Sequence, residues 1–256
     1  MAKIISIANQ KGGVGKTTTA VNLSACIAAK GKRVLLVDID PQGNATSGLG
    51  VESVAGKSIY NVLVDEIKIK EMVQPTVVKK LDICGANIDL AGAEIELVSM
   101  VSRETRLKKA IDDIKDDYDY IFIDCPPSLG LITLNAFTAS DSVLVPIQCE
   151  YYALEGLGQL INTIKLVQRH LNPELEIEGV VLTMFDARTN LSTQVATEVE
   201  KYFNNKVFQT IIPRNIRLSE APSHGLPITL YDPDSKGAET YKKLAKELLK
   251  LNERGE

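Results

Sequence analysis

The sequence contains few of the residues that build metal centres, and it has no long hydrophobic run. Its four cysteines are widely spaced without a C-x-x-C pair, and no other ligand type stands beside its two histidines. Both absences argue against a zinc or metal-cluster site and favour buried free thiols. The apolar runs fall far short of the roughly 20 residues that a membrane-spanning helix needs. The chain also starts directly with a predicted strand instead of a signal peptide. We therefore expect a soluble, cytoplasmic protein with no membrane partner.

Positive charge is not in excess either. The formal net charge is −4, which argues against a uniformly basic surface that coats nucleic acid but leaves a local basic patch open. Internal repeats, low-complexity linkers and breaks in composition are also absent. With 256 residues, of which 45% are hydrophobic, the chain can bury one sizeable core. We expect one domain spanning residues 1–256.

What the sequence does contain is a regular alternation of apolar runs and helical patterns. Most of the runs are continuously apolar, which is typical of strands covered by helices on both faces. The alternation predicts an α/β fold with a doubly wound, mostly parallel sheet and right-handed crossovers. The predicted strands are 3–8, 33–38, 81–84, 120–124, 142–146, 177–184 and 207–211. The predicted helices are 17–30, 58–64, 89–99, 103–115, 131–139, 154–170, 190–203 and 236–251.

A glycine-rich turn joins the first predicted strand to the first predicted helix. Gly12, Gly13 and Gly15 have no Cβ, so the backbone can bend sharply and direct its N–H groups inward. The start of the helix adds free N–H groups and the positive end of its dipole. Lys16 would then reach the β- and γ-phosphates of a nucleotide, and the Thr17 hydroxyl would bind Mg²⁺. The predicted phosphate-binding segment comprises Lys11, Gly12, Gly13, Val14, Gly15, Lys16, Thr17 and Thr18.

This turn departs from the general G-x-x-x-x-G-K-[ST] pattern at its first position. The pattern requires a glycine where Gln10 stands, and a second lysine, Lys11, follows at the front of the loop. The residues of the turn alone also allow an ordinary glycine-rich turn with solvated lysines. The strand before it and the helix after it favour the phosphate site.

Acidic residues follow two of the predicted strands, at the sheet edge where ligands bind in such folds. Asp38 and Asp40 stand at the end of strand 33–38, and they point the same way if the extended conformation continues. Asp124 ends strand 120–124. A carboxylate at such a position can orient a water for attack on the γ-phosphate or help to hold Mg²⁺. Ordinary strand-ending turns remain the alternative.

A proline-containing loop follows the last predicted strand. Pro213 and Asn215 could frame a nucleotide base there, since asparagine offers both a donor and an acceptor to a purine edge. The residue chemistry alone favours an ordinary loop.

Taken together, four segments resemble the ParA family of DNA-partitioning ATPases, and in particular its short chromosomal members called Soj. They are KGGVGKTT at 11–18, VLLVDIDPQGNATSGLG at 34–50, YIFIDCPPS at 120–128 and IIPRNIRLSEAPSHG at 211–225. CEYYALEGL at 149–157 and LTMFDARTN at 182–190 extend the resemblance over essentially the whole chain. The resemblance implies the P-loop NTPase fold of the deviant Walker A class. It also implies an ATPase that uses ATP and Mg²⁺ and drives chromosome or plasmid partitioning.

The resemblance assigns roles within the nucleotide site. Lys11 matches the signature lysine that crosses a nucleotide-sandwich dimer to the partner's phosphates, so its charge acts there only after dimerisation. Asp40 matches the residue that supports attack by water, and Asp38 lies in the same switch. The implied catalytic residues are Lys11, Lys16 and Asp40, the implied metal-site residues are Thr17, Asp38 and Asp124, and the implied adenine-side residues are Pro213 and Asn215.

The resemblance also implies partners. Family members bind double-stranded DNA non-specifically as ATP-dependent homodimers, and a ParB-type centromere-binding protein stimulates hydrolysis and release. Arg188 and Arg217 match the DNA-contacting arginines, and Arg214 is a neighbouring candidate. The residues alone favour solvated arginines. The DNA-reading domain of longer partition proteins has no room before strand 3–8, so we expect a nucleoid-associated protein without operator specificity.

Three other classes share the phosphate loop. A membrane-recruited ATPase of the MinD type would need a C-terminal amphipathic helix that docks on lipid. The last predicted helix instead places Tyr241, Leu244, Ala245 and Leu248 on one stripe with the spacing of a core-packed helix. A metal-cluster carrier would need paired cysteines. A small-molecule ligase would need a second substrate pocket, for which the sequence has no signal, and this alternative stays open.

Overall fold

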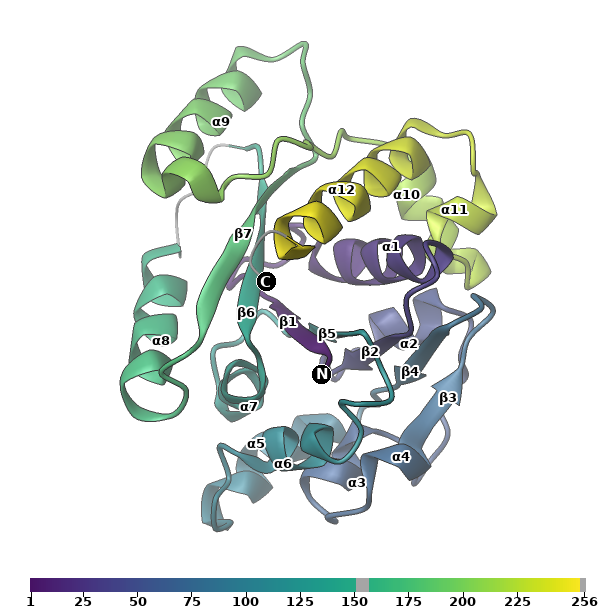
Figure 1. Ribbon diagram of the computed structural model, residues 1–256, viewed down its shortest axis with the longest axis vertical. Coiled ribbons are helices and arrows are strands. Elements are labelled where there is room, and N and C mark those ends of the chain that lie inside the picture. The colour runs from purple at the N-terminus through teal and green to yellow at the C-terminus, as the bar shows by residue number, and fades with distance from the viewer. Residues whose placement is uncertain (151–156, 254–256) are drawn as a thin grey trace.

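A seven-stranded sheet forms the centre of the computed structural model, which describes residues 1–150 and 157–253 (Figure 1). The strand order is β3-β4-β2-β5-β1-β6-β7. All neighbouring strands are parallel except β3 and β4, which are antiparallel. The strands are β1 Lys3–Ile7, β2 Val34–Asp38, β3 Val73–Pro75, β4 Leu81–Cys84, β5 Tyr120–Asp124, β6 Ser142–Gln148 and β7 Glu176–Thr183. The predicted doubly wound, mostly parallel sheet is confirmed.

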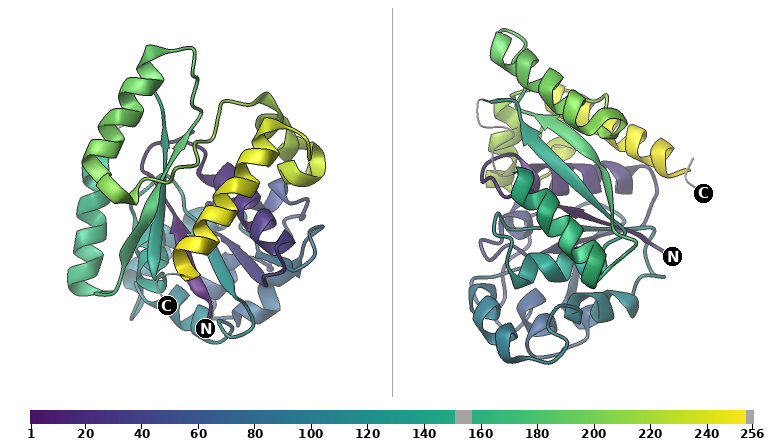
Figure 2. Two further views of the ribbon diagram at one scale, coloured as in Figure 1. Left: turned by 45° about the horizontal axis from the view of Figure 1, so that its top comes forward. Right: turned by 90° about the vertical axis from the view of Figure 1, so that its left-hand side faces the viewer.

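Helices cover both faces of this sheet. The longer ones are α1 Lys16–Ala29, α5 Leu90–Glu96, α6 Arg106–Asp112, α7 Leu131–Ala139, α8 Leu157–His170, α9 Asn190–Phe203 and α12 Lys236–Glu253. The shorter ones are α2 Asn44–Gly48, α3 Ile59–Leu63, α4 Ile69–Met72, α10 Ile216–Glu220 and α11 Ile228–Tyr231, with 3₁₀ turns at Leu97–Ser99, Asn204–Lys206 and Ala221–His224. Figures 1 and 2 show α1 and α12 side by side on one face of the sheet.

The alternation of side chains along each strand explains the continuously apolar runs. Ile5 and Ile7 of β1 pack into one core with α1 and α12, whereas Ile4 of the same strand packs into the core on the other face. Because both faces are covered, both sets of side chains must be apolar. All four cysteines are buried and unpaired, as predicted.

Helix α12 packs into the core through the apolar stripe that the sequence predicts. Tyr241, Leu244, Ala245 and Leu248 are buried, and the Tyr241 hydroxyl lies 3.2 Å from the Thr19 hydroxyl of α1. None of the described helices has the length and apolar character to cross a membrane.

One predicted strand was wrong, and one strand of the structure was not predicted. Residues 207–211 do not form a strand: Val207 makes only an isolated bridge to Val180. The Phe208 N–H donates to the Val180 carbonyl and the Ile212 N–H to the Leu182 carbonyl, so this segment runs beside β7 with an interrupted ladder. The edge strand β3 was not predicted, because it has three residues and ends in proline, which weakens any strand signal.

Helix boundaries also differ from the predictions. The segment 103–115 was predicted as one helix but α6 spans only Arg106–Asp112. The first residues of the predicted helix 154–170 lie outside the described residues, and α8 is described from Leu157.

Candidate functional site

The predicted phosphate-binding segment forms a turn between β1 and α1. Gly13 and Gly15 have φ angles of 73° and 85°, which lie in the left-handed region that favours glycine. A Cβ placed on Gly12 or Gly13 would meet no atom within 4 Å, so the outer side of the turn is open. The turn can therefore receive a ligand against its backbone.

Side chains from other strands hold this turn in place. The Thr183 hydroxyl at the end of β7 donates to the Val14 carbonyl at 2.8 Å. Asn9 donates from Nδ2 to the Pro146 carbonyl at 2.7 Å and accepts from the Lys11 N–H at 3.0 Å. The ends of β6 and β7 thus fix the shape of the loop before any ligand binds. Thr183 and Asn9 were not predicted from the sequence, where a polar residue at a strand end was the only signal.

Lys16 is the first residue of α1 and is buried. Its ammonium group donates to the Lys11 carbonyl at 3.1 Å, across the mouth of the turn. Burial lowers the pKa of Lys16, and the negative charges of Asp124 and Asp40 oppose that shift. The Lys16 ammonium group thus lies inside the loop. An anion bound there would offset the cost of burying this charge.

Asp38 and Asp124 lie side by side at the carboxyl ends of β2 and β5. They are register partners in the sheet, and both are completely buried. Asp38 is well bonded: Oδ2 accepts from the Thr46 hydroxyl at 2.7 Å and the Thr46 N–H at 2.9 Å, and Oδ1 accepts from the Asp40 N–H at 3.1 Å. Thr46 of α2 is a third residue that was not predicted from the sequence.

Asp124, in contrast, has no hydrogen-bond partner for either carboxylate oxygen among the described residues. The Thr17 side chain lies close enough to lower the pKa of Asp124, but its geometry falls short of a hydrogen bond. Burial and the Asp38 charge outweigh this effect and raise the pKa of Asp124 well above its ordinary value. Burial likewise raises the pKa of Asp38 to about 6.

An unpartnered buried carboxylate fits a divalent cation. Carboxylate and hydroxyl oxygens are the ligands that Mg²⁺ prefers, and a protein usually supplies only one or two carboxylates beside the substrate phosphates. Thr17 and Asp124 form such a pair of oxygen donors. Among the described residues, no three His, Cys, Asp or Glu side chains gather into a self-contained metal site, which agrees with a cation held partly by a nucleotide.

Asp40 lies just beyond Asp38 and is largely buried. One of its carboxylate oxygens accepts from the Gln42 N–H at 3.0 Å, which fixes the turn that follows β2. Its charge contributes to the raised pKa of Asp38, so the two carboxylates are close. The structure therefore brings Lys16, Asp38, Asp40 and Asp124 together at one end of the sheet, as the sequence predicted.

Pro213 and Asn215, the residues predicted to frame the base, lie in the loop that follows residues 207–211, the segment beside β7. Pro213 pairs with Phe185 in an isolated bridge. The Asn215 side-chain oxygen accepts from the Arg217 N–H at 2.9 Å and caps α10. Its amide nitrogen forms no described bond, so Asn215 keeps a donor for a ligand while its oxygen serves the helix.

The three predicted DNA arginines are exposed, and each has a carboxylate partner. Arg188 donates twice to Asp186, at 2.7 and 2.9 Å. These bonds lower the pKa of Asp186 to about 2. Arg214 pairs with Glu150. The segments around Arg188 and Arg214 lie together, because the Arg214 N–H donates to the Phe185 carbonyl at 3.1 Å.

Arg217 has two acidic partners, Glu220 and Asp232. Its guanidinium lies 2.9 Å from Glu220 and 3.3 Å from Asp232. None of these three arginines is therefore a bare positive charge, and a phosphate would have to displace or share a carboxylate.

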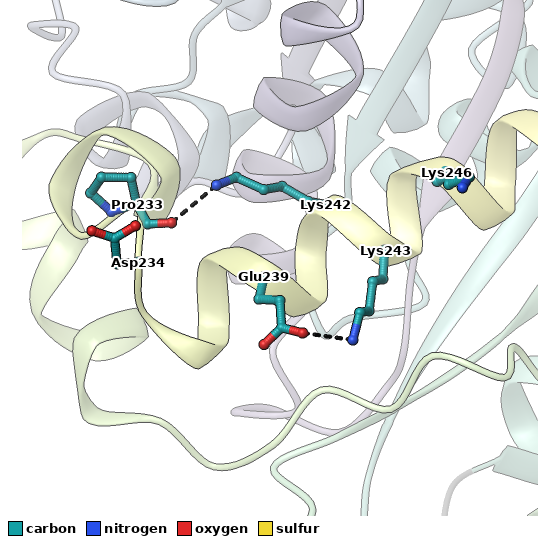
Figure 3. Close-up of a pocket in the computed structure, with 6 residues that line it drawn as sticks. All are labelled: Pro233, Asp234, Glu239, Lys242, Lys243 and Lys246. Carbon is teal, nitrogen blue, oxygen red and sulfur yellow. Dashed lines mark hydrogen bonds and ion pairs between the residues drawn. The ribbon is translucent and has the colours of Figure 1, made fainter.

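A shallow groove beside α12 is separate from these residues. Lys242, Lys243 and Lys246 line it together with Pro233, Asp234 and Glu239 (Figure 3). Lys242 donates to the Pro233 carbonyl and Lys243 pairs with Glu239. None of the predicted site residues lines the groove.

Several known proteins are similar to this chain over nearly its whole length. A family described as an AAA domain matches residues 2–177. The sporulation initiation inhibitor protein Soj of Bacillus subtilis (strain 168) is 66% identical over 249 residues, which cover 97% of this chain and 98% of that protein. The chromosome partitioning protein ParA of Myxococcus xanthus (strain DK1622) is 56% identical over 252 residues, covering 98% and 89%. Cobyrinic acid a,c-diamide synthase from Mycobacterium smegmatis, solved with an ATP analog and magnesium, superposes with a TM-score of 0.88 at 38% identity, covering 100% and 98%.

Proposed function

This chain belongs to the Soj/ParA family of chromosome-partitioning ATPases, and we propose that it is an ATP-dependent dimer that binds DNA non-specifically and hydrolyses ATP. In this proposal a ParB-type partner stimulates hydrolysis and thereby drives chromosome or plasmid partitioning. The chain acts as one ATPase domain, in the cytoplasm and on the nucleoid. The observation that carries the proposal is the unpartnered Asp124 carboxylate, buried beside the phosphate loop and Lys16.

ATP would lie against the turn from Lys11 to Thr18. The open outer side of Gly12 and Gly13 leaves room for phosphates beside the backbone N–H groups. Lys16 would exchange its bond to the Lys11 carbonyl for one to a phosphate, which gains a charge-assisted contact. Pro213 and Asn215 would hold the adenine side. The ATP analog in the Mycobacterium smegmatis structure supports this assignment.

Thr17 and Asp124 would hold Mg²⁺, with Asp38 behind them. Magnesium supplies positive charge that offsets the charge developing on the phosphate oxygens. The bonds from Thr46 and Asp40 hold Asp38 in a single orientation. Asp40 would orient the attacking water, because its second carboxylate oxygen accepts no bond within the turn.

Lys11 would act across a dimer. Its backbone is engaged by Asn9 and Lys16, but no described carboxylate pairs with its ammonium group, which leaves that charge for a second protomer's phosphates. The added positive charge would reach the reacting phosphates only after two nucleotide-bound chains meet. Dimerisation would thus be required for full turnover.

DNA binding is assigned to Arg188, Arg214 and Arg217. One monomer presents these few arginines, each shared with a carboxylate, so its attachment to phosphates would be weak. Two protomers double the phosphate contacts, and attachment then depends on ATP.

Small-molecule ligation is the second candidate, since the Mycobacterium smegmatis neighbour carries the name of an amide-forming synthase. The partition proteins share more identity with this chain, 66% and 56% against 38%. We therefore retain partitioning. The stripe of α12 is buried in the core, which disfavours a MinD-type membrane helix there.

Two variants separate the proposed steps. Asp40→Ala should bind ATP and form a persistent dimer that turns over slowly, because it removes a group that orients water but no phosphate ligand. Lys11→Ala should bind ATP yet stay monomeric. Light scattering with ATP and a phosphate-release assay measure both. A monomeric Asp40→Ala protein or a dimeric Lys11→Ala protein would contradict the assignments.

A further inference from the structure

Two glycines from distant parts of the chain meet with their backbones in contact. Gly50 follows helix α2 by two residues, and Gly225 ends the 3₁₀ turn Ala221–His224. Their φ angles are 70° and 64°, in the left-handed region that favours glycine. A Cβ on Gly225 would lie 2.7 Å from the Gly50 Cα, and a Cβ on Gly50 would lie 3.0 Å from the Gly225 carbonyl oxygen. The two segments therefore touch directly through their backbones, and we call this pair the glycine contact.

On one side, the glycine contact leads to the buried carboxylate of Asp38. The Gly50 N–H donates to the Ser47 carbonyl at 2.9 Å, at the end of α2. Thr46 of the same helix holds Asp38 through its hydroxyl at 2.7 Å and its N–H at 2.9 Å. Thr46 and Gly50 are about one helical turn apart. A displacement of the Asp38 carboxylate therefore reaches the glycine contact through a single short helix.

On the other side, the glycine contact leads to Arg217. Residues 216–231, which we call the arginine segment, comprise α10, the 3₁₀ turn and α11. Glu220 accepts from the Arg217 guanidinium at 2.9 Å and from the Tyr231 hydroxyl at 3.2 Å. The Tyr231 ring stacks on the His224 ring, with 4.8 Å between their centroids. These bonds tie the two ends and the turn of the arginine segment together, so it responds as one unit.

A second attachment holds the arginine segment to α1. Asn22 of α1 accepts from the Ile228 N–H at 2.7 Å and donates to the Thr18 carbonyl at 2.8 Å. α1 begins at the phosphate turn and contacts α11 (Figure 1). Because Asn22 bonds within a long helix that is packed in the core, this attachment does not depend on α2. The arginine segment thus has an anchor on α1 and a separate contact with the helix that holds Asp38.

We propose that the glycine contact transmits the state of the phosphate site to the arginine segment. Asp38 and α2 would be held differently with ATP than with ADP, and the backbone contact would pass this difference to Gly225 while Asn22 holds Ile228. The orientation of Arg217 would then depend on the number of phosphates bound. The proposal deepens the proposed function, on which it rests for the consequence that this orientation controls attachment to DNA.

The adenine side does not explain such a difference. Asn215 caps α10 and is the proposed base-side residue next to the arginine segment, but the adenine ring is common to ATP and ADP. A difference between the two nucleotides in this segment must therefore come from the phosphate side. Asp38 lies on that side and is bonded to α2, which leads to the glycine contact.

Three glycines with similar φ angles provide a graded set of alanine variants. Gly225→Ala places a Cβ 2.7 Å from a backbone carbon, so the two segments must separate. Gly50→Ala is milder, with a Cβ 3.0 Å from an oxygen. Gly56 has a φ angle of 74°, and a Cβ there would meet no atom within 4 Å. Gly56→Ala thus introduces similar backbone strain away from the contact and is the matched control.

The first measurement is hydrogen exchange of the arginine segment, with ADP and with a non-hydrolysable ATP analog. In the unaltered protein and in Gly56→Ala we expect the exchange rates with the two nucleotides to differ by about fivefold or more, the lower end of typical coupling between sites. The difference should fall in Gly50→Ala and fall further in Gly225→Ala. Light scattering should show the same dimer with the analog in all four proteins, which excludes assembly as the cause of the loss.

Four results would overturn the proposal. The first is equal exchange with both nucleotides in the unaltered protein, and the second is an undiminished difference in Gly225→Ala and Gly50→Ala. The third is an equal loss in Gly56→Ala, which would assign the effect to backbone strain alone. The fourth is loss of the dimer in Gly225→Ala, which would assign the contact to assembly. If Gly225→Ala does not fold, Gly50→Ala, with its smaller overlap, decides the matter.

The second measurement tests the consequence for DNA. The ratio of duplex affinity with the ATP analog to that with ADP should fall by about fivefold or more in Gly225→Ala relative to Gly56→Ala. An unchanged ratio beside the expected exchange pattern would overturn the control of DNA attachment by this contact. If the exchange pattern holds while the unaltered protein binds no DNA with either nucleotide, the proposed DNA function fails and the coupling through the glycine contact stands.

Discussion

At the scale of single residues, two neighbouring buried carboxylates are costly to the folded state. Asp38 and Asp124 meet at the ends of adjacent strands, away from water. Burying an ionised carboxylate without a cation is unfavourable, so the group takes up a proton more readily in the folded state. This cost is tolerated at a place that binds a cation and is difficult to explain elsewhere.

The Asp38 carboxylate leads to a pH prediction. Its pKa is raised to about 6 in the folded state by burial, from an ordinary value of 3.8. Between these values the folded state keeps a proton that the unfolded state has released, so stability falls as the pH rises through this window. The loss amounts to roughly 3 kcal/mol at most, since one pKa unit corresponds to about 1.4 kcal/mol.

Urea unfolding of the nucleotide-free protein between about pH 4 and pH 7 measures this loss. The matched variant Asp38→Asn should be less stable overall, because it loses an acceptor for Thr46 or Asp40, but its stability should decline less over the same range. Parallel declines in the two proteins would show that Asp38 is not the titrating group.

Lys16 gives the second prediction at this scale. Lys16→Ala removes the ammonium group that would contact the phosphates, and we expect ATP affinity to fall by roughly 1.5–3 kcal/mol or more. The fold should survive, because alanine is a good helix former at the start of α1. Calorimetry with ATP measures the loss, and Lys30→Ala at the exposed end of the same helix is the control. Unchanged affinity for Lys16→Ala would mean that the turn does not bind phosphates.

The single residues that the sequence revealed are those with distinctive local patterns. Lys16 follows a glycine-rich turn, and Asp38 and Asp124 end apolar strands, so their positions followed from the chain around them. Thr46 and Thr183 were missed, because their partners Asp38 and Val14 are defined only by the folded chain. Glu150 was missed as the partner of Arg214 for the same reason, since the two residues are far apart in the sequence.

At the scale of elements, the phosphate turn depends on its neighbours β6 and β7. The Thr183 hydroxyl is buried and holds the Val14 carbonyl. Thr183→Val removes this bond and leaves the carbonyl unpaired, which should cost about 1–3 kcal/mol of stability and lower ATP affinity as well. Thr138→Val is the matched control, since its buried hydroxyl donates to the Leu134 carbonyl within α7, away from the turn.

Thermal unfolding and ATP calorimetry together test this prediction. Both variants should lose stability, and only Thr183→Val should lose affinity. Equal affinities would show that the turn keeps its shape without β7.

The elements that could be read from the sequence are the long and strongly patterned ones. Most of the six confirmed predicted strands are apolar on both faces, as a covered parallel sheet requires. The segment 207–211 is equally apolar, but its ladder with β7 is interrupted, and local pattern contains no information on pairing. Where Phe208 meets β7, the ring lies against Gly179, with Cε2 only 2.5 Å from the place of a Cβ there. A larger residue at position 179 could not fit beside this segment.

At the scale of the whole molecule, DNA binding depends more on where the charges lie than on the net charge. The chain has a net charge of −4, and its proposed DNA face consists of arginines that already share carboxylates. Exposed ion pairs of this kind contribute little to stability, so the arginines can exchange partners at small cost. DNA attachment should therefore be weak for a monomer and sensitive to salt.

The measurement that tests the central claim most directly is duplex DNA binding with ATP, with ADP and without nucleotide, over a range of salt concentrations. We predict sequence-independent DNA binding with ATP but not with ADP or without nucleotide. The affinity for DNA should decline steeply as the salt concentration rises. Arg217→Ala removes two phosphate contacts from a symmetric dimer, so the slope of log affinity against log salt should fall by about 1.8. Arg188→Ala combined with Arg217→Ala should bind far more weakly while ATP still produces a dimer. Binding that ignores the nucleotide, or a double variant that binds DNA as tightly as the unaltered protein, would contradict the account.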